Sequence, residues 1–365
     1  MPTIFASARG GTAGGFNLLG GFFILHRICL PQYTVTEESF PSIRELYNRE
    51  KLLPEPPSIF VTPAWLETWW QAFGEGAAAA LLAVRQNRRV AGLAPLMIRG
   101  KEASFMGSPA VCDYLDFWAA PGEEEPVAAA VLNHLMQKGI NKLDLHSLHP
   151  GSAALAGLPG AAKALGWSCE CTREAVSVGL ELPPTWEGYL DALTKKQRHE
   201  VRRKLRRLEE AGPYRYRVIT GEKALAFIPL FLDMFTRNPE KANFLTGAVA
   251  IFFPGALKAA VQSGPGRFGL LELAGRVAAA VFYFDFRGND YLYNSAYDPE
   301  FRNVSAGLLC KVLHIKDAIA RGRGFYDFLR GGEEYKYRLG GRDIPIYRCS
   351  VARLERPHNP AGGRT

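Results

Sequence analysis

The sequence predicts a mixed α/β protein in which one folding unit occurs twice in tandem. Its 365 residues suffice for two domains that each bury a core. Two stretches repeat the same order of strands and helices, and equivalent positions such as Val90 and Val277, or Leu143 and Tyr326, lie 187 and 183 residues apart. Hydrophobic residues make up 47% and charged residues 22%, as in a globular protein.

The elements of the first copy follow from hydrophobic periodicity and turn residues. A helix over 42–51 precedes a proline-rich breaker at 54–57, and Thr62-Pro63 is typical of the start of a second helix over 64–73. The expected series then continues with strands over 80–85, 89–98, 103–106 and 114–118, a helix over 123–138, and a strand over 142–148.

The second copy repeats this series. It contains expected strands over 268–273, 276–286 and 291–296, a helix over 305–320, and a strand over 325–329. The predicted domains are therefore 33–180 and 181–353. They are flanked by a tail over 354–365 and by a Gly- and Ala-rich segment over 1–32, interpreted as a mobile tail or a misassigned translation start.

The strongest functional feature is the start of the helix over 305–320. An aromatic strand leads to a turn at Asp298-Pro299, and Ser305-Ala306-Gly307 then opens the helix. The free N–H groups and the dipole of a helix N-terminus suit a phosphate, and small residues allow its close approach. The expected ligand is therefore a phosphate-bearing cofactor.

These features resemble the Gcn5-related acyltransferases, specifically the CelD-like branch related to the Fem aminoacyl transferases. The resemblance spans about 55–350 and includes the Tyr-Asp-Pro loop at 297–299, the Tyr-Asp-Phe strand at 326–328 and Gly-Glu-Glu-Tyr-Lys at 332–336. It implies that the helix start binds the pyrophosphate of acyl-coenzyme A as co-substrate, whereas the Fem relatives use aminoacyl-tRNA. It does not imply an acceptor.

By this resemblance, the strand before the pyrophosphate loop separates from its neighbour and pairs with the pantetheine arm. The cofactor-binding candidates are Tyr293, Asn294, Tyr297, Arg302, Ser305, Ala306 and Gly307. Residues also expected around the reaction centre are Tyr293, Asn294, Tyr297, Asp298 and Glu333. The catalytic candidates are Asp285, Asp327, Tyr335 and Lys336.

Each catalytic candidate also has a structural interpretation. Asp285 is a general base or a strand-end residue bound to the turn at Gly288, and Asp327 is catalytic or a clasp onto a neighbouring loop. Tyr335 is the acid for the departing thiolate or a packing tyrosine. Lys336 contacts substrate or forms an i,i+3 ion pair with Glu333. Ser305 binds phosphate or caps the helix.

The two copies differ at the helix start. The first copy has Glu123, Glu124 and Glu125 where the second has Ser305-Ala306-Gly307. These carboxylates complement the helix dipole but repel a phosphate. Only the second copy is therefore expected to bind coenzyme A.

The net charge of +8 is local, because residues 195–207 hold eight Lys or Arg against one Glu. Lys195 to Leu208 forms an amphipathic pattern whose polar face is cationic, so this helix is either a solvated face or the site of an anionic partner. The candidates are an anionic saccharide, a lipid headgroup, tRNA and the cofactor's 3′-phosphate. Nucleic acid other than tRNA is not expected, since no aromatic residues alternate with the charges.

The six cysteines are scattered, and Cys169-Glu-Cys171 has no second pair to complete a zinc site, so no metal is expected. We expect buried free thiols, a reducing cytoplasm, and no membrane-spanning segment. The apolar run over 20–30 is interrupted by His26 and Arg27, unlike a targeting segment.

Three functions fit the sequence. The first is a cytoplasmic acyl-coenzyme A-dependent N-acyltransferase acting on a small-molecule amine, an amino sugar or an envelope precursor. The second is a Fem-like aminoacyl transferase that uses aminoacyl-tRNA. The third is a non-catalytic binding protein on the same fold.

Overall fold

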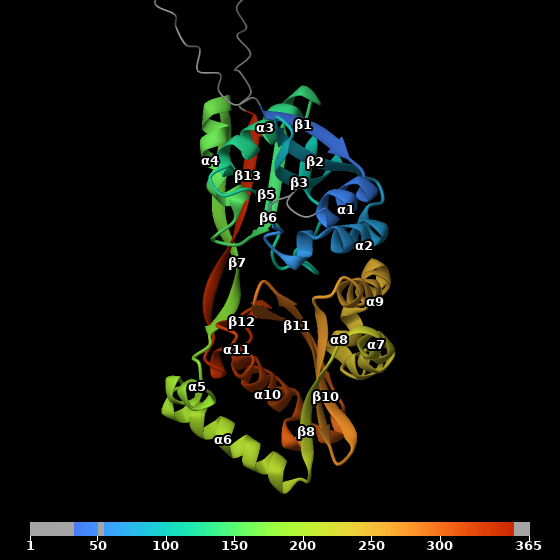
Figure 1. Cartoon of the computed structure of the whole chain (residues 1–365), viewed down its shortest axis with the longest axis vertical. Helices are drawn as coiled ribbons and strands as arrows, with labels where there is room; N and C mark the ends of the chain where they lie inside the picture. The colour runs from blue at the N-terminus through green and yellow to red at the C-terminus, as the bar shows by residue number, and fades with distance from the viewer. Residues whose placement is uncertain (1–32, 50–54, 354–365) are drawn as a thin grey trace, which may run out of the picture. The chain divides into compact units, whose positions relative to one another are not determined.

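The computed structural model describes residues 33–49 and 55–353. The tails expected over 1–32 and 354–365, the apolar run over 20–30 and Cys29 lie outside the described residues. In the first half of the chain the elements are β1 (Tyr33–Glu38), α1 (Phe40–Asn48), η1 (Ile59–Val61), α2 (Pro63–Phe73), β2 (Ala78–Gln86), β3 (Arg89–Arg99), β4 (Glu102–Phe105), β5 (Trp118–Ala119), α3 (Glu124–Gln137), β6 (Lys142–Leu148), α4 (Ala153–Leu165) and β7 (Trp167–Glu181) (Figure 1).

The second half begins with helices before its strands repeat the earlier series. Its elements are α5 (Trp186–Ala192), α6 (Lys195–Glu210), β8 (Tyr214–Ile219), α7 (Gly221–Thr236), α8 (Pro239–Phe244), α9 (Gly247–Gln262), β9 (Gly266–Leu273), β10 (Arg276–Phe286), β11 (Asn289–Tyr297), η2 (Pro299–Val304), α10 (Ala306–Ala320), β12 (Phe325–Arg330), α11 (Glu334–Arg338) and β13 (Arg342–Arg353).

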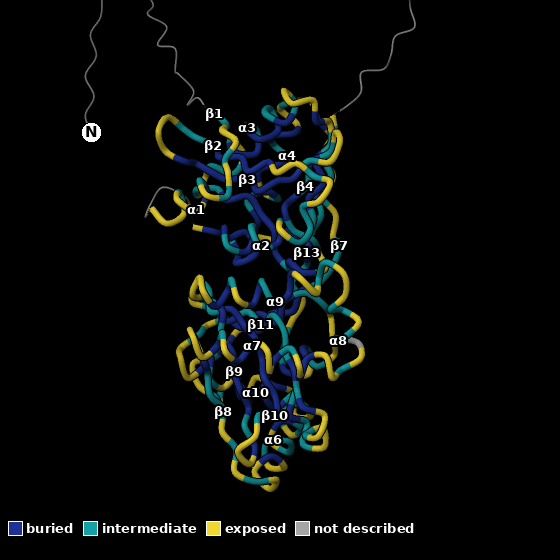
Figure 2. Tube along the Cα trace, turned by 90° about the vertical axis from the view of Figure 1, so that its right-hand side faces the viewer, coloured by how far each residue is buried: buried dark blue, intermediate teal, exposed yellow. Residues whose placement is uncertain are grey.

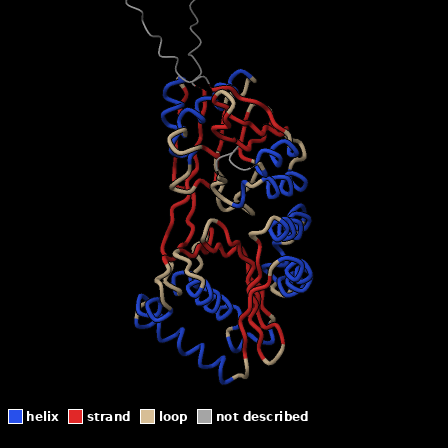
Figure 3. Tube along the Cα trace, in the orientation of Figure 1, coloured by secondary structure: helices blue, strands red, loops and turns tan. Residues whose placement is uncertain are grey.

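The described strands form one mixed sheet with the order β1-β2-β3-β4-β6-β13-β7-β12-β11-β10-β9-β8, and β5 pairs with β3 (Figure 3). The order is the same when read from either edge, with β2, β3, β4 and β6 in the places of β9, β10, β11 and β12. In both copies the pairing is antiparallel until the step from β4 to β6, or from β11 to β12, which is parallel. The fold is therefore two tandem copies of one mixed α/β unit, as predicted.

The two central strands connect the copies. β7 and β13 are antiparallel over nearly their whole length, from the pair Gly179 and Arg342 to the pair Trp167 and Arg353. β7 also pairs with β12 of the second copy, and β13 with β6 of the first. Each copy therefore places its last strand beside a strand of the other.

Most element predictions agree with the structure, but the strand expected over 114–118 is wrong. Only Trp118 and Ala119 form a short strand there. The carboxylate of Asp116 instead accepts hydrogen bonds from the Ser152 hydroxyl and from the N–H groups of Ala153 and Ala154. The residues before Trp118 therefore bind the start of α4 rather than a strand.

The expectation of free thiols is wrong for two cysteines. Cys171 of β7 and Cys349 of β13 are opposite in register and form a disulfide. Among the described residues, Cys112, Cys169 and Cys310 are free, and Cys112 and Cys310 are buried as expected. The sequence spacing missed the disulfide because 178 residues separate partners that only the exchange of β7 and β13 brings together.

Two hydrophobic clusters hold the sheet and its helices together. One includes α7 and α9 on one face of the second-copy strands, and the other includes α10 and parts of α5 and α6 on the opposite face. The strands are mostly buried, whereas loops and outer helix faces are exposed (Figure 2). Within residues 33–49 and 55–353, no helix is long and apolar enough to cross a bilayer.

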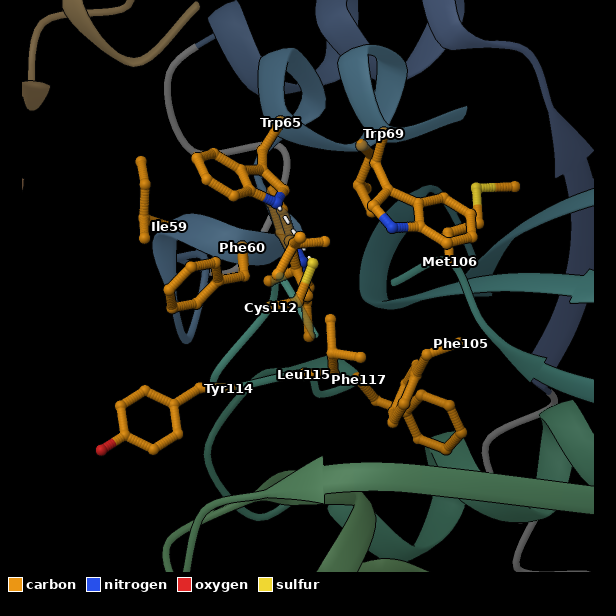
Figure 4. Close-up of a cluster of buried hydrophobic side chains, with 14 of the residues drawn as sticks. Ile59, Phe60, Trp65, Trp69, Phe105, Met106, Cys112, Tyr114, Leu115 and Phe117 are labelled. Atoms are coloured by element: carbon orange, nitrogen blue, oxygen red, sulfur yellow. Dashed lines mark hydrogen bonds between the residues drawn. The ribbon is translucent and has the colours of Figure 1, made fainter. Parts of the chain in front are cut away.

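Trp65 of α2 joins the aromatic core across the two copies. Its indole N–H donates to Cys112 Sγ at 3.4 Å (Figure 4). The Trp65 ring also meets the rings of Phe252, Phe284 and Tyr293 edge to face at 5.5 to 5.6 Å between centroids. Because Tyr293 is on β11, first-copy residues help to fix the strand that borders the main cavity.

Candidate functional site

A cavity of about 750 Å³ lies between β11, β12, α8, the start of α10 and a loop of the first copy. Ten predicted residues line it, together with others that the sequence did not indicate. The predicted ones are Tyr293, Asn294, Tyr297, Arg302, Ser305, Ala306, Gly307, Glu333, Tyr335 and Lys336. The predicted cofactor-binding residues thus lie together around one cavity.

The cavity opens where β11 separates from β12. The two strands pair only at Asp290 with Tyr326 and at Tyr291 with Asp327, although β11 continues to Tyr297. A register shift in the pairing with β10 leaves Tyr293 as an extra residue in β11. Beyond the register shift, β11 no longer pairs with β12, so this edge of the strand borders the cavity without a strand partner. The Ser295 carbonyl accepts from Lys241, and the Ser295 N–H donates to Asn294 Oδ1.

The start of α10 provides an anion-binding end to the cavity. Ser305 has φ of 58°, and its side chain makes no capping hydrogen bond, so the capping interpretation of this hydroxyl is wrong. The first N–H groups of a helix have no acceptor inside it. A Cβ added to Gly307 would lie 3.1 Å from Cδ1 of Tyr297, which explains a residue without a side chain there.

The basic helix α6 reaches this helix start. Lys204 Nζ donates to Ser305 Oγ at 2.7 Å and lies 3.4 Å from Glu200. Arg302, at the end of η2, also lines the cavity. Two cationic side chains therefore accompany the helix dipole at the place predicted for a pyrophosphate.

Tyr335 and Lys336 of α11 line the cavity in different ways. Lys336 is 2% exposed, and its Nζ donates to the carbonyls of Leu329, Arg330 and Gly331 and pairs with Glu333 at 2.9 Å. The predicted ion pair is present, and these four acceptors join Lys336 to the end of β12 and to the loop that follows it. Burial raises the pKa of the Tyr335 hydroxyl, so the phenol stays protonated at neutral pH.

Asp285 and Asp327 do not line this cavity. Asp285 forms ion pairs with Arg323 at 2.6 Å and Arg267 at 2.9 Å, rather than binding the turn at Gly288. Asp327 accepts hydrogen bonds from Tyr114 at 2.8 Å and from the N–H of Leu329 at 2.7 Å, and burial raises its pKa to about 6. The geometry thus gives Asp327 the position of a clasp between the copies.

The Asp298 carboxylate stabilises the turn before η2 and does not line the cavity. This carboxylate accepts from the N–H of Glu300 at 3.0 Å and lies 3.3 Å from Arg276. Asp298 begins η2, in agreement with the predicted turn.

Sequence reasoning did not identify four charged residues of the cavity: Asp113, Lys241, Lys311 and Arg330. Asp113 comes from the first copy, accepts from the N–H of Arg330 at 3.1 Å, and has a pKa raised to about 6 by burial. The sequence pattern could have indicated Lys311, because this residue lies between Leu308 and Ile315 on the apolar face of its helix. A charge on such a face requires a partner or a function. Asp113 and Lys241 lie outside any periodic pattern.

Comparison with known proteins agrees with this architecture. Residues 195–337 match the family described as acetyltransferase (GNAT) domain. The matched residues make up most of the second copy, so this part of the chain is similar to that family. None of the curated proteins matches the sequence.

Solved structures extend the likeness of fold over most of the chain. FemX has a TM-score of 0.58 at 13% identity, with 86% of this chain and 96% of FemX covered. A conserved protein of unknown function from Bacteroides thetaiotaomicron has a TM-score of 0.57 at 11% identity, with 88% and 100% covered. The fold of this chain is therefore similar to that of FemX over most of its length.

Proposed function

We propose that this protein is an acyltransferase that moves an acyl group from coenzyme A to an amine, and that the second copy holds the cofactor. The observation that carries the proposal is the start of α10, where Ser305, Ala306 and Gly307 border a cavity beside the unpaired end of β11. A pyrophosphate fits the helix start, and a pantetheine arm fits the free edge of the strand.

In this proposal, Lys204 and Arg302 support the phosphates. Amide formation joins the amine nitrogen to the thioester carbonyl and breaks the carbon–sulfur bond. The amine must lose a proton, and the thiolate that leaves must gain one. Asp113 is positioned in the cavity to take the first proton, and the Tyr335 phenol to give the second.

The acceptor is proposed only as a class, namely an amine on a small molecule such as an amino sugar, or on an envelope precursor. Its support is the Fem-related fold alone. We also propose the boundary between the copies near residue 181, where β7 ends.

A cytoplasmic location belongs to the proposal because coenzyme A thioesters are intracellular. The disulfide between Cys171 and Cys349 is of a kind more common in oxidising compartments. Thiol titration of protein taken directly from cells tests the location, since this disulfide is expected to be reduced in the cytoplasm.

The direct test of function is thermal unfolding with coenzyme A and with acyl-coenzyme A thioesters of several lengths. A ligand that binds only the folded protein raises its unfolding temperature. At 100 times the Kd, the stabilisation is about 2.7 kcal/mol. No stabilisation by any of these compounds at millimolar concentration would contradict the proposal.

Transfer from aminoacyl-tRNA is a second candidate, and the outer face of α6 favours it. Five of its cations are exposed, namely Lys195, Lys196, Arg202, Arg206 and Arg207. Salt-sensitive binding of tRNA without stabilisation by coenzyme A would select this alternative. A tight protein complex with neither response would instead indicate a non-catalytic binding protein.

A further inference from the structure

Lys311 brings a buried ammonium group to the cavity. The residue is 8% exposed, and its Nζ donates to the Gly307 carbonyl at 3.1 Å and lies 4.9 Å from the centre of the Tyr335 ring. An ammonium has three N–H donors. Within the described residues, Lys311 has this one hydrogen-bond acceptor and no ion pair.

Lys241 brings a second ammonium from a different helix. It projects from α8, and its Nζ donates to the side-chain carbonyl of Asn294 at 3.2 Å and to the main-chain carbonyl of Ser295. Both acceptors are on the part of β11 that no longer pairs with β12. Lys241 therefore lies beside the strand proposed to hold the pantetheine arm.

The charge of Glu333 raises the pKa of both lysines, but neither carboxylate of the cavity forms an ion pair with them. Glu333 pairs with Lys336, and Asp113 accepts from the N–H of Arg330. Burial lowers the pKa of Lys241 to about 7 and of Lys311 to about 8, and the charge of Lys311 further lowers the pKa of Lys241. Two lysine side chains thus face one cavity, Lys311 buried and Lys241 half-buried, and neither has a paired carboxylate.

Burial of an unpaired charge costs free energy, and an anionic ligand removes that cost. We infer that Lys241 and Lys311 together bind a carboxylate on one of the two substrates, beside the reacting thioester. This inference rests on the proposed acyltransferase function. A phosphate of the cofactor is not the anion in question, because the proposed phosphate site is at Ser305, where Lys204 already donates.

The carboxylate has two chemical sources. It is the free end of a dicarboxylic acyl group on the donor, or it is an acid group on the amine acceptor. Both sources require the same two lysines, and binding measurements with matched pairs of compounds separate them.

The first measurement compares succinyl-coenzyme A with butyryl-coenzyme A, whose acyl chains have equal length and differ in the terminal carboxylate. Titration calorimetry uses the full chain, Lys241→Met, Lys311→Met and, as a matched control, Lys258→Met on the exposed face of α9. If the donor carries the carboxylate, the unmodified chain and the control bind the succinyl compound about tenfold more tightly, as expected for one charge-assisted interaction. Either cavity variant abolishes this preference and keeps its affinity for butyryl-coenzyme A.

The second measurement titrates β-alanine and β-alaninamide into protein saturated with coenzyme A. If the acceptor carries the carboxylate, β-alanine binds about tenfold more tightly, and both cavity variants lose this difference. A preference in either measurement that depends on both lysines supports the inference and identifies the source.

Two results overturn the inference. The first is that neither measurement shows a preference for the compound with the carboxylate. The second is a preference that remains in both Lys241→Met and Lys311→Met. Equal weakening of coenzyme A, butyryl and succinyl binding makes the lysines phosphate ligands instead. Failure of the unmodified chain to bind coenzyme A at all contradicts the proposed function as well. Thermal unfolding of each variant confirms that it is folded, because methionine retains the unbranched chain and removes the buried charge.

Discussion

Lys204 Nζ lies 2.7 Å from the hydroxyl oxygen of Ser305. This hydrogen bond joins α6, the most basic helix of the described structure, to the first residue of the proposed phosphate site. Lys204 is less exposed than the outer cations of the same helix, since its side chain is 17% exposed. The inner face of α6 therefore belongs to the cavity, whereas its outer face is free for a different partner.

Replacement of Lys204 by Met should weaken coenzyme A binding about tenfold, since a charge-assisted hydrogen bond contributes roughly 1.5 to 3 kcal/mol. The loss should be smaller at high ionic strength, because salt already screens the attraction. Calorimetric titration in low and high salt measures both effects. Lys196→Met, an exposed change on the same helix, is the control. Equal losses in the two variants would indicate general attraction instead of a contact.

Gly307 offers a test of the helix start itself. Gly307→Ala places a Cβ 3.1 Å from Cδ1 of Tyr297, which a small movement of the ring accommodates. Gly307→Glu adds negative charge at the predicted pyrophosphate position and should weaken coenzyme A binding by at least tenfold more than Gly307→Ala. Binding and thermal unfolding are measured on both variants. Coenzyme A affinity of Gly307→Glu equal to that of Gly307→Ala would exclude the pyrophosphate assignment.

The sequence predicted those parts of the fold that local periodicity determines. The strands over 142–148 and 276–286 agree with β6 and β10 residue for residue, because their hydrophobic runs end at clear turns. The cofactor-binding candidates gather around one cavity because the loop and helix start that carry them are contiguous in the chain.

Features that depend on distant pairing were missed. The exchange of β7 and β13, and with it the disulfide between Cys171 and Cys349, requires strands from opposite ends of the chain to meet. Asp113 enters the cavity from a first-copy loop for the same reason. Asp285 and Asp327 were placed near the reaction centre by resemblance, but their ion pairs and hydrogen bonds lie outside the cavity.

The outer face of α6 should act on the acceptor and not on the cofactor. Arg202 and Arg206 are exposed, whereas Arg203 pairs with Glu200 at 2.9 Å. Arg202→Glu combined with Arg206→Glu should leave coenzyme A binding unchanged and raise the KM for an anionic acceptor severalfold. Steady-state kinetics and cofactor titration are compared with Arg202→Gln combined with Arg206→Gln, which removes charge without reversing it. Unchanged kinetics in the Glu variant would make this face a solvated surface.

The buried side chain of Lys311 predicts a pH dependence of stability. The pKa of Lys311 falls from 10.5 to about 8 because the folded protein desolvates it, while Cys310 and Glu333 raise the pKa and Lys336 lowers it. Between these two pKa values the unfolded chain binds more protons, so the free energy of unfolding rises with pH from about 8 to 10. Below about pH 8, Lys311 is charged in both states, and its desolvation lowers the free energy of unfolding by the full amount, on the order of 3 kcal/mol.

Lys311→Met should therefore unfold at a higher denaturant concentration than the unmodified chain at pH 7, and the difference should narrow as pH rises toward 10. The loss of the hydrogen bond to Gly307 offsets part of the gain. The difference in free energy of unfolding between the two proteins is taken at each pH. Asp113, Asp116 and Asp327 have raised pKa values in both proteins, so their titration cancels in this difference. A difference independent of pH would show that Lys311 is not desolvated.

The N-terminus of α10 should bind coenzyme A, whereas the N-terminus of α3 should not. In the first copy, α4 lies against the first turn of α3, because a Cβ on Gly157 would be 2.2 Å from the Glu124 carbonyl and one on Gly160 would be 2.5 Å from the Glu125 carboxylate. A cavity of about 600 Å³ beside this turn presents Glu124 and Asp116. α4 therefore covers one side of this helix start, and the carboxylates that line the cavity on the other side oppose a pyrophosphate there.

Titration should consequently find one coenzyme A site per chain. Substitution of Ser, Ala and Gly for Glu123, Glu124 and Glu125 should leave this number unchanged, because α4 still covers the helix start when the carboxylates are gone. Three glutamates in place of Ser305, Ala306 and Gly307 should abolish the site, and Glu at Gly307 alone separates lost binding from lost folding. Circular dichroism checks that each variant is folded. Two equivalent sites in the unmodified chain would contradict both the asymmetry and the assignment of cofactor binding to the second copy.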